Sequence, residues 1–211
     1  MKSILRSGVC ALCAALLPLL PAGCGGGGDD DGDFGDNDKN LVVCIGDSIT
    51  EGYRCIGDPY PTRLAAMSGK KVKNYGVGGS TSDYGVSVID GALARKPGYA
   101  CILYGANDCI CGSDLDQTVE NLRSIVRACK ANKTKAIIAT PTPMNGEHAI
   151  YNGRVQILAP AVKAMAKEEG VTCIDLNKAF GDGSDYLNPD DGLHLNDAGG
   201  DLIAKKFNSK M

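Results

Sequence analysis

Short strand-like runs alternate with longer amphipathic segments along most of the chain. The runs that predict strands are Leu41–Ile45, Val72–Tyr75, Ala100–Tyr104, Ala136–Ala139 and Val171–Ile174. The segments that predict helices are Pro61–Met67, Ser82–Ala94, Asp114–Lys130, Gly153–Glu169 and Ala198–Phe207. Strands separated by helices are typical of parallel βαβ units. We therefore expect an α/β fold, a three-layer αβα sandwich around a five-stranded parallel sheet.

The segment Asp114–Lys130 has the clearest helical pattern. Its apolar residues fall on one face: Leu115, Val119, Leu122, Val126 and Cys129. Either Ser113 or Asp114 is expected to cap its first turn. In the helix expected at Gly153–Glu169, Pro160 should bend or restart the helix, because proline lacks an N–H and clashes with the preceding turn.

The N-terminal segment has the layout of a secretory signal. A basic start precedes the apolar stretch Val9–Leu20, which is too short to span a membrane comfortably. The end of residues 1–24 resembles a bacterial lipoprotein signal, in which Cys24 is lipidated. Pro21 departs from that motif, and ordinary signal cleavage near Ala22 is the alternative. We expect an exported protein, anchored at the cell envelope by lipid or otherwise periplasmic or secreted.

The rest of the chain divides into a linker and one domain. Residues 25–40 are almost entirely Gly, Asp and Asn, which predicts a flexible acidic linker. Residues 41–211 are numerous enough for one domain with a core of its own. The formal net charge is −3 and no basic patch is visible, which argues against a nucleic-acid partner. Membrane contact is expected only through the N-terminal lipid.

Seven cysteines follow the signal segment. Three lie in strand-like runs and are expected in the core: Cys44, Cys101 and Cys173. Cys55, Cys109 and Cys111 lie in loops, and disulfides form outside the cytoplasm. We expect Cys55 either to pair with Cys109 or Cys111 or to stay reduced. A Cys-x-Cys pair without a neighbouring histidine is weak support for a metal site.

Ligands of parallel α/β sheets bind at the carboxyl ends of the strands, so the loops after strands are candidate site loops. The first is Gly46-Asp47-Ser48, where the serine is either a nucleophile or a helix cap. It is not a Gly-x-Ser-x-Gly elbow. The second, residues 74–81, is rich in glycine but fits neither phosphate-binding motif. Its glycines either bring an amide N–H to a ligand or form a flexible turn.

Two further loops carry side chains with candidate chemistry. Asn107 follows the third strand, where its amide either donates to an oxyanion or closes a turn. Asp191 precedes His194 by three residues, a spacing that lets a carboxylate hold the ring and leave its far nitrogen free as a base. Asp190 is the alternative carboxylate. The other histidine, His148, is expected in a loop.

These four loops, in this order, resemble the blocks of the SGNH hydrolases, also called the GDSL esterase/lipase family. The resemblance runs from Leu41 to about Phe207, with Ile49 in place of the leucine of the motif. It implies a flavodoxin-like sandwich and a catalytic triad in which Ser48 is the nucleophile. His194 is then the base, and Asp191 completes the triad.

The family also forms an oxyanion hole from two backbone N–H groups and an asparagine side chain. The resemblance assigns these donors to Ser48, Gly79 and Asn107. We interpret Asp47 and Asp108 as hydrogen-bond acceptors that fix the loops.

The resemblance implies hydrolysis of carboxylic esters through an acyl-enzyme, without metal or organic cofactor. The absence of an inserted lid favours short acyl groups, such as acetyl on a carbohydrate. The alternatives are a lysophospholipase or acyl thioesterase and, in another class, a non-catalytic surface protein that binds glycans. Tyr53–Tyr60 and Pro141–Tyr151 are expected to line the substrate.

Overall fold

The structure, a computed structural model, describes residues 33–211. Its sheet has five strands: β1 (Asp38–Gly46), β2 (Lys71–Gly76), β3 (Pro97–Leu103), β4 (Lys135–Ala139) and β5 (Thr172–Ile174). Every neighbouring pair is parallel, and the order across the sheet is β2-β1-β3-β4-β5. The expected five-stranded parallel sheet is therefore confirmed.

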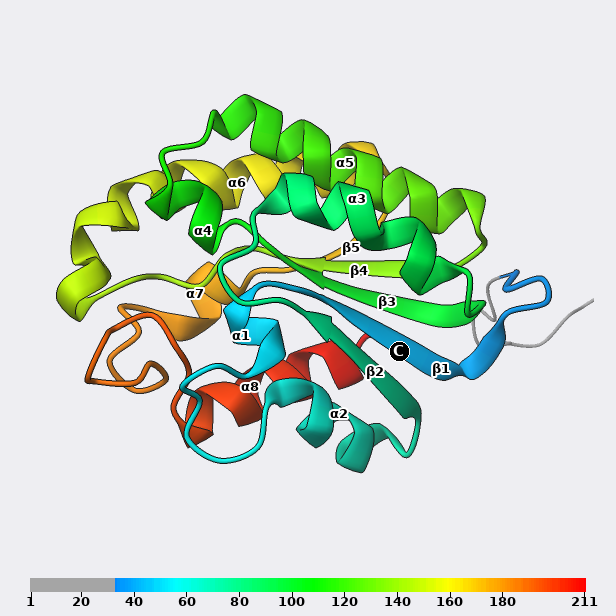
Figure 1. Cartoon of the computed structure of the whole chain (residues 1–211), viewed down its shortest axis with the longest axis horizontal. Coiled ribbons are helices and arrows are strands. Elements are labelled where there is room, and N and C mark those ends of the chain that lie inside the picture. Colours follow the sequence, from blue (N-terminus) through cyan, green and yellow to red (C-terminus); the bar gives the residue numbers. More distant parts are fainter. Residues whose placement is uncertain (1–32) are drawn as a thin grey trace, which may run out of the picture. The chain divides into compact units, whose positions relative to one another are not determined.

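Helices cover both faces of the sheet (Figure 1). The longer ones are α2 (Tyr60–Ser68), α3 (Ser82–Leu93), α5 (Leu115–Ala131), α6 (Asn152–Glu168) and α8 (Asp197–Asn208). In Figure 1, α3, α5 and α6 lie above the sheet and α2 and α8 lie below it. The three-layer αβα sandwich is confirmed, and these five helices correspond to the five predicted ones.

The cap expected at Ser113 or Asp114 is confirmed, whereas the restart considered at Pro160 does not occur. The Asp114 side chain accepts hydrogen bonds from the N–H groups of Asp116 and Gln117, so Asp114 is the cap of α5. Pro160 lies inside α6, which does not restart there. Proline leaves the Gln156 carbonyl without its helical donor, and both residues are exposed, so water can satisfy that carbonyl.

Four short helical segments were not predicted. They are α1 (Ser48–Glu51), α4 (Ala106–Ile110), the 3₁₀ segment η1 (Gly146–Tyr151) and α7 (Leu176–Phe180). None has more than six residues, so none repeats its apolar pattern often enough to be recognised. Two of them, α1 and α4, directly follow β1 and β3.

The centre of the core is the pair of strands β1 and β3. All seven residues of β3 are buried, because helices cover both of its faces. In the layer below, the rings of Tyr60 and Phe207 stack with centroids 5.6 Å apart and join α2 to α8. No helix within residues 33–211 has the length and apolar character that a membrane span requires.

The folded region begins before the predicted boundary at Leu41. Phe34 is only 5% exposed, and its ring lies 5.3 Å from that of Tyr99. The Asn37 side chain donates to the Asn132 carbonyl, and β1 begins at Asp38. The prediction of a flexible linker is therefore wrong for residues 33–40, because Phe34 anchors them to the core. The signal segment and Cys24 lie outside the described residues.

The cysteines of the described region are all free thiols. Cys109 is buried in the hydrophobic core, and burial raises its pKa to about 12. Cys111 is exposed, whereas the Cys55 thiol donates to the Gly57 carbonyl at 3.3 Å. The disulfide considered between Cys55 and Cys109 or Cys111 is absent, because Cys109 points into the core and Cys55 is held by its own loop.

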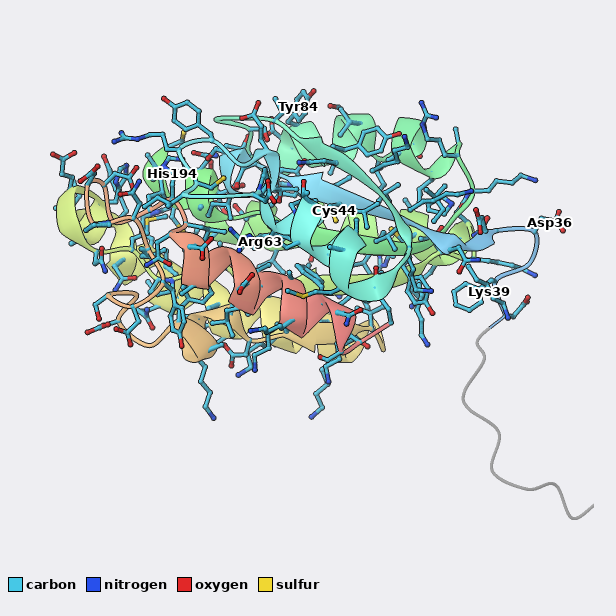
Figure 2. All side chains as sticks on the ribbon, turned by 90° about the horizontal axis from the view of Figure 1, so that it is seen from below. Asp36, Lys39, Cys44, Arg63, Tyr84 and His194 are labelled. Atoms are coloured by element: carbon cyan, nitrogen blue, oxygen red, sulfur yellow. The ribbon has the colours of Figure 1, made fainter. Side chains whose placement is uncertain are left out.

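The chain reverses its direction of winding at β1, which lies between β2 and β3. The chain adds β2 on one side of β1 and then crosses to add β3 on the other side. Such a reversal opens a crevice between the carboxyl ends of β1 and β3. The crevice lies where β1 and β3 pair at Gly46 and Leu103. Figure 2 shows His194 at the opposite end of this folded unit from Asp36 and Lys39, near the start of β1.

Candidate active site

Three predicted side chains form a hydrogen-bonded chain at the end of the sheet. The Nε2 atom of His194 lies 3.0 Å from Oγ of Ser48, and its Nδ1 atom lies 2.9 Å from Oδ2 of Asp191. Ser48 and His194 are each 7% exposed, so their contact is shielded while one edge reaches the surface. The structure thus brings together a serine and an aspartate that are far apart in the sequence.

The Asp191 carboxylate is held from several sides. Its Oδ1 atom accepts hydrogen bonds from the N–H groups of Leu193 and His194, at 2.9 and 3.0 Å. Burial alone would raise the pKa of Asp191, but the hydrogen bonds from the His194 ring and from these two amides lower it overall. Asp190 is exposed and donates its own N–H to Asn188, so Asp191 is the carboxylate that meets His194.

The turn after β1 needs glycine to bring the serine into place. A Cβ atom on Gly46 would lie 2.1 Å from Oγ1 of Thr50 and 2.4 Å from the Leu103 carbonyl, so a side chain has no room there. Without one, α1 folds tightly against the strand end and presents Ser48 in its first turn. Backbone N–H groups in a first turn have no partner within their own helix, so the Ser48 N–H is suited to bind an anion.

Asp47 caps this turn, as expected of a loop-fixing acceptor. Its Oδ1 atom accepts from the Ile49 N–H at 2.9 Å. Its Oδ2 atom is buried and has no hydrogen-bond partner within residues 33–211. Burial, with a contribution from the charge of Asp108, raises the pKa of Asp47 to about 7.

The two other predicted oxyanion donors lie on neighbouring loops. Gly79 adopts φ +74°, a left-handed conformation that glycine takes without strain. The Asn107 side-chain amide donates one hydrogen to the Ser80 carbonyl at 3.0 Å, which fixes its orientation and leaves its second hydrogen available. Both residues border the same hollow as Ser48.

Asp108 fixes the turn after β3, as expected. It is buried, and its carboxylate accepts from the backbone N–H of Ser82 at 3.1 Å and from the Ser82 hydroxyl at 2.6 Å. The Thr118 hydroxyl lies 3.2 Å from the same carboxylate. Asp108 therefore joins α4 to the first turn of α3 and to α5.

A hollow of about 370 Å³ lies over the serine. Its lining combines the predicted site residues with apolar and aromatic groups: Ser48, Tyr53, Gly78, Gly79, Asn107, Ile110, His148, Leu193 and His194. Tyr53 is 57% exposed, and its ring meets that of His194 edge-on at 5.2 Å. Tyr53 and His148 come from the two segments expected to line the substrate.

Arg54 lies in the segment Tyr53–Tyr60 that was expected to line the substrate, but its contact with Asp191 was not predicted. Its Nε atom lies 3.4 Å from Oδ2 of Asp191, and its backbone is left-handed, with φ +51°. Nothing in the local sequence distinguishes this arginine, because the contact depends on two loops that are far apart in the chain. Ile110 and Leu193 were missed for the same reason.

The arrangement has the parts that acyl transfer requires. A hydroxyl contacts an imidazole, a carboxylate orients that imidazole, and amide donors border the space above the hydroxyl. Among residues 33–211, no three His, Cys, Asp or Glu side chains are grouped so that they could hold a metal ion.

Two curated relatives match much of this chain. An acetylxylan esterase from Xylanibacter ruminicola is 30% identical over 203 residues, which cover 80% of this chain and 42% of that protein. This chain thus spans less than half of that relative's length. The Thioesterase 1/protease 1/lysophospholipase L1 of Escherichia coli is 28% identical over 166 residues, which cover 74% of this chain and 76% of that protein.

Solved structures share the fold. A lipase/acylhydrolase from Enterococcus faecalis superposes with a TM-score of 0.70 at 25% identity, over 81% of this chain and 94% of that one. A catalytic mutant of an acetylxylan esterase from Geobacillus stearothermophilus superposes with a TM-score of 0.67 at 24% identity, over 81% of this chain and 93% of that one. The sequence pattern of the GDSL-like Lipase/Acylhydrolase family matches residues 44–202. The chain therefore belongs to the GDSL-like lipase/acylhydrolase family, whose members are hydrolases of ester bonds.

Proposed function

We propose that this protein is a serine esterase that removes short acyl groups, such as acetyl, from a carbohydrate. The observation that carries the proposal is the hydrogen-bonded chain from Ser48 through His194 to Asp191, at 3.0 and 2.9 Å. This geometry supports Ser48 as the nucleophile, because its proton has an acceptor that is already in place.

In the first step Ser48 Oγ attacks the acyl carbon while Nε2 of His194 takes the hydroxyl proton. Asp191 accepts the Nδ1 hydrogen and stabilises the imidazolium that forms. The negative charge on the former carbonyl oxygen is held by the N–H groups of Ser48 and Gly79 and by the Asn107 amide. The C–O bond to the alcohol then breaks, and His194 gives its proton to the departing oxygen.

In the second step water hydrolyses the acyl-enzyme. His194 takes a proton from the water as its oxygen attacks the acyl carbon, and the same donors stabilise the second oxyanion. The bond between Ser48 Oγ and the acyl carbon breaks, and His194 returns the proton to Ser48. The products are a carboxylic acid and the free serine hydroxyl.

The size of the hollow supports a small acyl group. Its volume of about 370 Å³ is near the lower end of ligand pockets, which run from roughly 300 to 1,000 Å³. Ile110 and Leu193 offer apolar surface to a methyl group. The relative in Xylanibacter ruminicola and the fold neighbour in Geobacillus stearothermophilus are both acetylxylan esterases, which supports acetyl on a sugar as the substrate.

Hydrolysis of p-nitrophenyl acetate tests the proposal directly. Wild-type protein, Ser48→Ala and His194→Ala are compared, with circular dichroism to establish that all three are folded. We expect activity in the wild type and its loss in both variants. A folded wild type without activity, and without labelling by a fluorophosphonate probe, would favour the glycan-binding alternative.

A lysophospholipase or acyl thioesterase is the second candidate function. The Escherichia coli relative favours it, because its name gives both activities and the match covers three quarters of that protein. The acetate, butyrate and octanoate esters of p-nitrophenol separate the two candidates. A maximum of kcat/KM at acetate supports the acetylesterase, whereas a maximum at octanoate supports the second candidate.

We also propose that the protein is exported and anchored through a lipid on Cys24, on the strength of the N-terminal sequence alone. Expression of the full chain and of Cys24→Ala in a bacterium tests this. The full chain should fractionate with membranes and the variant should be released. Release of both would favour ordinary signal cleavage.

A further inference from the structure

The chain has a second histidine, His148, at the same hollow as His194. His148 belongs to η1 and borders the hollow that also contains Ser48 and His194. Its Nδ1 atom lies 2.7 Å from the backbone carbonyl oxygen of Asp191. The mechanism proposed above does not use this side chain.

The Asp191 contact determines which nitrogen of His148 carries the hydrogen. A carbonyl oxygen only accepts, so Nδ1 must be the donor. In the neutral ring Nε2 then carries a lone pair and can only accept. Within residues 33–211 no hydrogen bond engages this Nε2 atom. In the neutral ring, Nε2 of His148 is therefore an acceptor without a hydrogen-bond donor among residues 33–211.

The backbone around His148 is hydrogen-bonded to the loop that contains Asp191 and His194. The His148 N–H donates to the Asn145 carbonyl at 3.0 Å, and the Asn145 N–H donates to the Gly192 carbonyl at 2.9 Å. A Cβ atom on Gly192 would lie 2.1 Å from the Asn145 oxygen, so these two segments are in close contact. The position of Nε2 is therefore set relative to Asp191 and, through it, to His194.

The other side chains around the hollow differ in what they offer a substrate. Ile110 and Leu193 are apolar, Asn107 carries an amide, and Tyr53 carries a hydroxyl that can also accept. The His194 ring is engaged at both nitrogens, by Ser48 and Asp191. An acceptor on a residue that borders the same hollow as the reacting serine fits a hydroxyl donor on the substrate better than it fits a plain alkyl group.

We propose that Nε2 of His148 accepts a hydrogen bond from a free hydroxyl on the alcohol portion of the ester, and so selects monoesters of polyhydroxy compounds. This inference rests on the proposed esterase function and specifies its substrate class. The hydroxyl lies on a carbon near the esterified one, since His148 and Ser48 border one hollow. His148 is thus a specificity-determining residue.

Two small esters that differ by one group measure this selection. In 2-hydroxyethyl acetate a hydroxyl stands where propyl acetate has a methyl group. The ratio of their kcat/KM values, divided by the ratio of their rates with hydroxide, reports enzyme recognition of the hydroxyl. We expect a corrected ratio of about 10 for the wild type, the size of one hydrogen bond to a neutral partner.

Two substitutions distinguish recognition of the substrate hydroxyl by Nε2 from the hydrogen bond between Nδ1 and the Asp191 carbonyl. The amide nitrogen of asparagine can replace Nδ1, so His148→Asn keeps the bond to the Asp191 carbonyl and removes the acceptor at Nε2. The amide of glutamine reaches the position of Nε2, so His148→Gln restores an acceptor there and gives up the Nδ1 contact. We expect a corrected ratio below about 2 for His148→Asn and above about 3 for His148→Gln.

A purely structural role of His148 leaves the corrected ratio the same in both variants. His148→Asn would then keep the wild-type kcat/KM for both esters, whereas His148→Gln would lower it equally for both. That result overturns the proposal. Glu147→Gln is the matched control, since Glu147 is an exposed neighbour outside the hollow, and it should keep the wild-type ratio. Thermal melts establish that each variant is folded.

Failure of this inference can be told from failure of the esterase assignment. A wild type that hydrolyses p-nitrophenyl acetate but has a corrected ratio near 1 overturns the role of His148 and leaves the esterase in place. A folded wild type that hydrolyses none of the three esters and resists the fluorophosphonate probe overturns both.

Discussion

The strands β1 and β3 end side by side, and each is followed by a short helix with a buried aspartate, Asp47 at the N-cap of α1 and Asp108 within α4. After β3, Asp108 receives hydrogen bonds from the amide and hydroxyl of Ser82 and lies 3.2 Å from the Thr118 hydroxyl. After β1, Asp47 receives one bond, and its second oxygen has no partner within residues 33–211. Similar positions in the sheet thus have very different polar environments.

This difference matches two roles: the turn after β3 supports the fold, and the turn after β1 holds the candidate nucleophile. The turn after β3 is satisfied and joins three helices through Asp108. The turn after β1 holds Ser48 close to His194 and leaves a buried oxygen unpaired, which costs stability. Proteins commonly concentrate such costs at functional sites, where the surrounding fold holds an unfavourable arrangement in place. Substitutions in the two turns should therefore have different effects.

Ser48→Ala in the turn after β1 should have the largest effect. We expect kcat/KM for p-nitrophenyl acetate to fall by about 10⁴-fold or more, because the members of such a triad act as a unit. The melting temperature should change little, since the substitution removes one hydroxyl. A variant that keeps a tenth of the activity would contradict the assignment of the nucleophile.

Asn107→Ala in the turn after β3 should have the next largest effect. Loss of one oxyanion donor typically lowers kcat by roughly 100- to 1,000-fold. Steady-state kinetics should place the loss in kcat, with KM changed less than threefold. Asn107→Asp is the matched control, because a carboxylate keeps the shape but cannot donate, and it should be as impaired as the alanine variant.

Asp108→Ala should mainly lower the free energy of unfolding. It leaves the Ser82 N–H without its buried acceptor, and one such unsatisfied group costs about 1–3 kcal/mol. Urea unfolding followed by circular dichroism measures the change, for which we expect about 3 kcal/mol. Asp108→Asn keeps one acceptor oxygen and should lose less. Equal losses in the two variants would mean that these hydrogen bonds are not the cause.

Asp47→Asn should have the smallest effect and the opposite sign at neutral pH. The folded pKa of Asp47 is raised by burial from 3.8 to about 7. Below about pH 4 both the folded and the unfolded state bind the proton. Between about pH 4 and pH 7 only the unfolded state releases it, so this residue makes the free energy of unfolding fall as pH rises. Above about pH 7 both states have released the proton, and the loss of unfolding free energy no longer grows with pH.

Asparagine has no charge to bury. The free energy of unfolding of Asp47→Asn should therefore fall less than that of the wild type between about pH 4 and pH 7. At pH 8 we expect it to be more stable than the wild type by about 1 kcal/mol, since its amide hydrogens would themselves lack acceptors. Urea unfolding at pH 4, 6 and 8 measures the difference between the two proteins. A difference that does not vary with pH would show that Asp47 does not titrate in this window.

The sequence was sufficient for the elements that repeat a pattern. The five strands and five longer helices follow from apolar runs and helical spacing, and the sandwich follows from their alternation. The short helices α1 and α4 could not be found this way, because five residues or fewer contain no repeat. The start of the fold was placed too late because burial of Phe34 depends on Tyr99, which is distant in the sequence.

The candidate site was predictable where a residue type and a spacing combine. The spacing of Asp191 and His194 predicted their contact, whereas the contact of His194 with Ser48 was implied by the resemblance to the SGNH hydrolases. The contacts of Arg54 and His148 with Asp191 have no local signature, because each joins loops from different parts of the chain. The unpaired oxygen of Asp47 depends in the same way on packing.

The most direct test of the account is fluorophosphonate labelling followed by peptide mass spectrometry. The reagent reacts with a serine hydroxyl only where a base activates it, so it reports the contact between Ser48 and His194. We predict one adduct, on the peptide that contains Ser48, absent in Ser48→Ala and at least about 1,000-fold slower to form in His194→Ala. A folded wild type that forms no adduct, or forms it on another serine, would contradict the account.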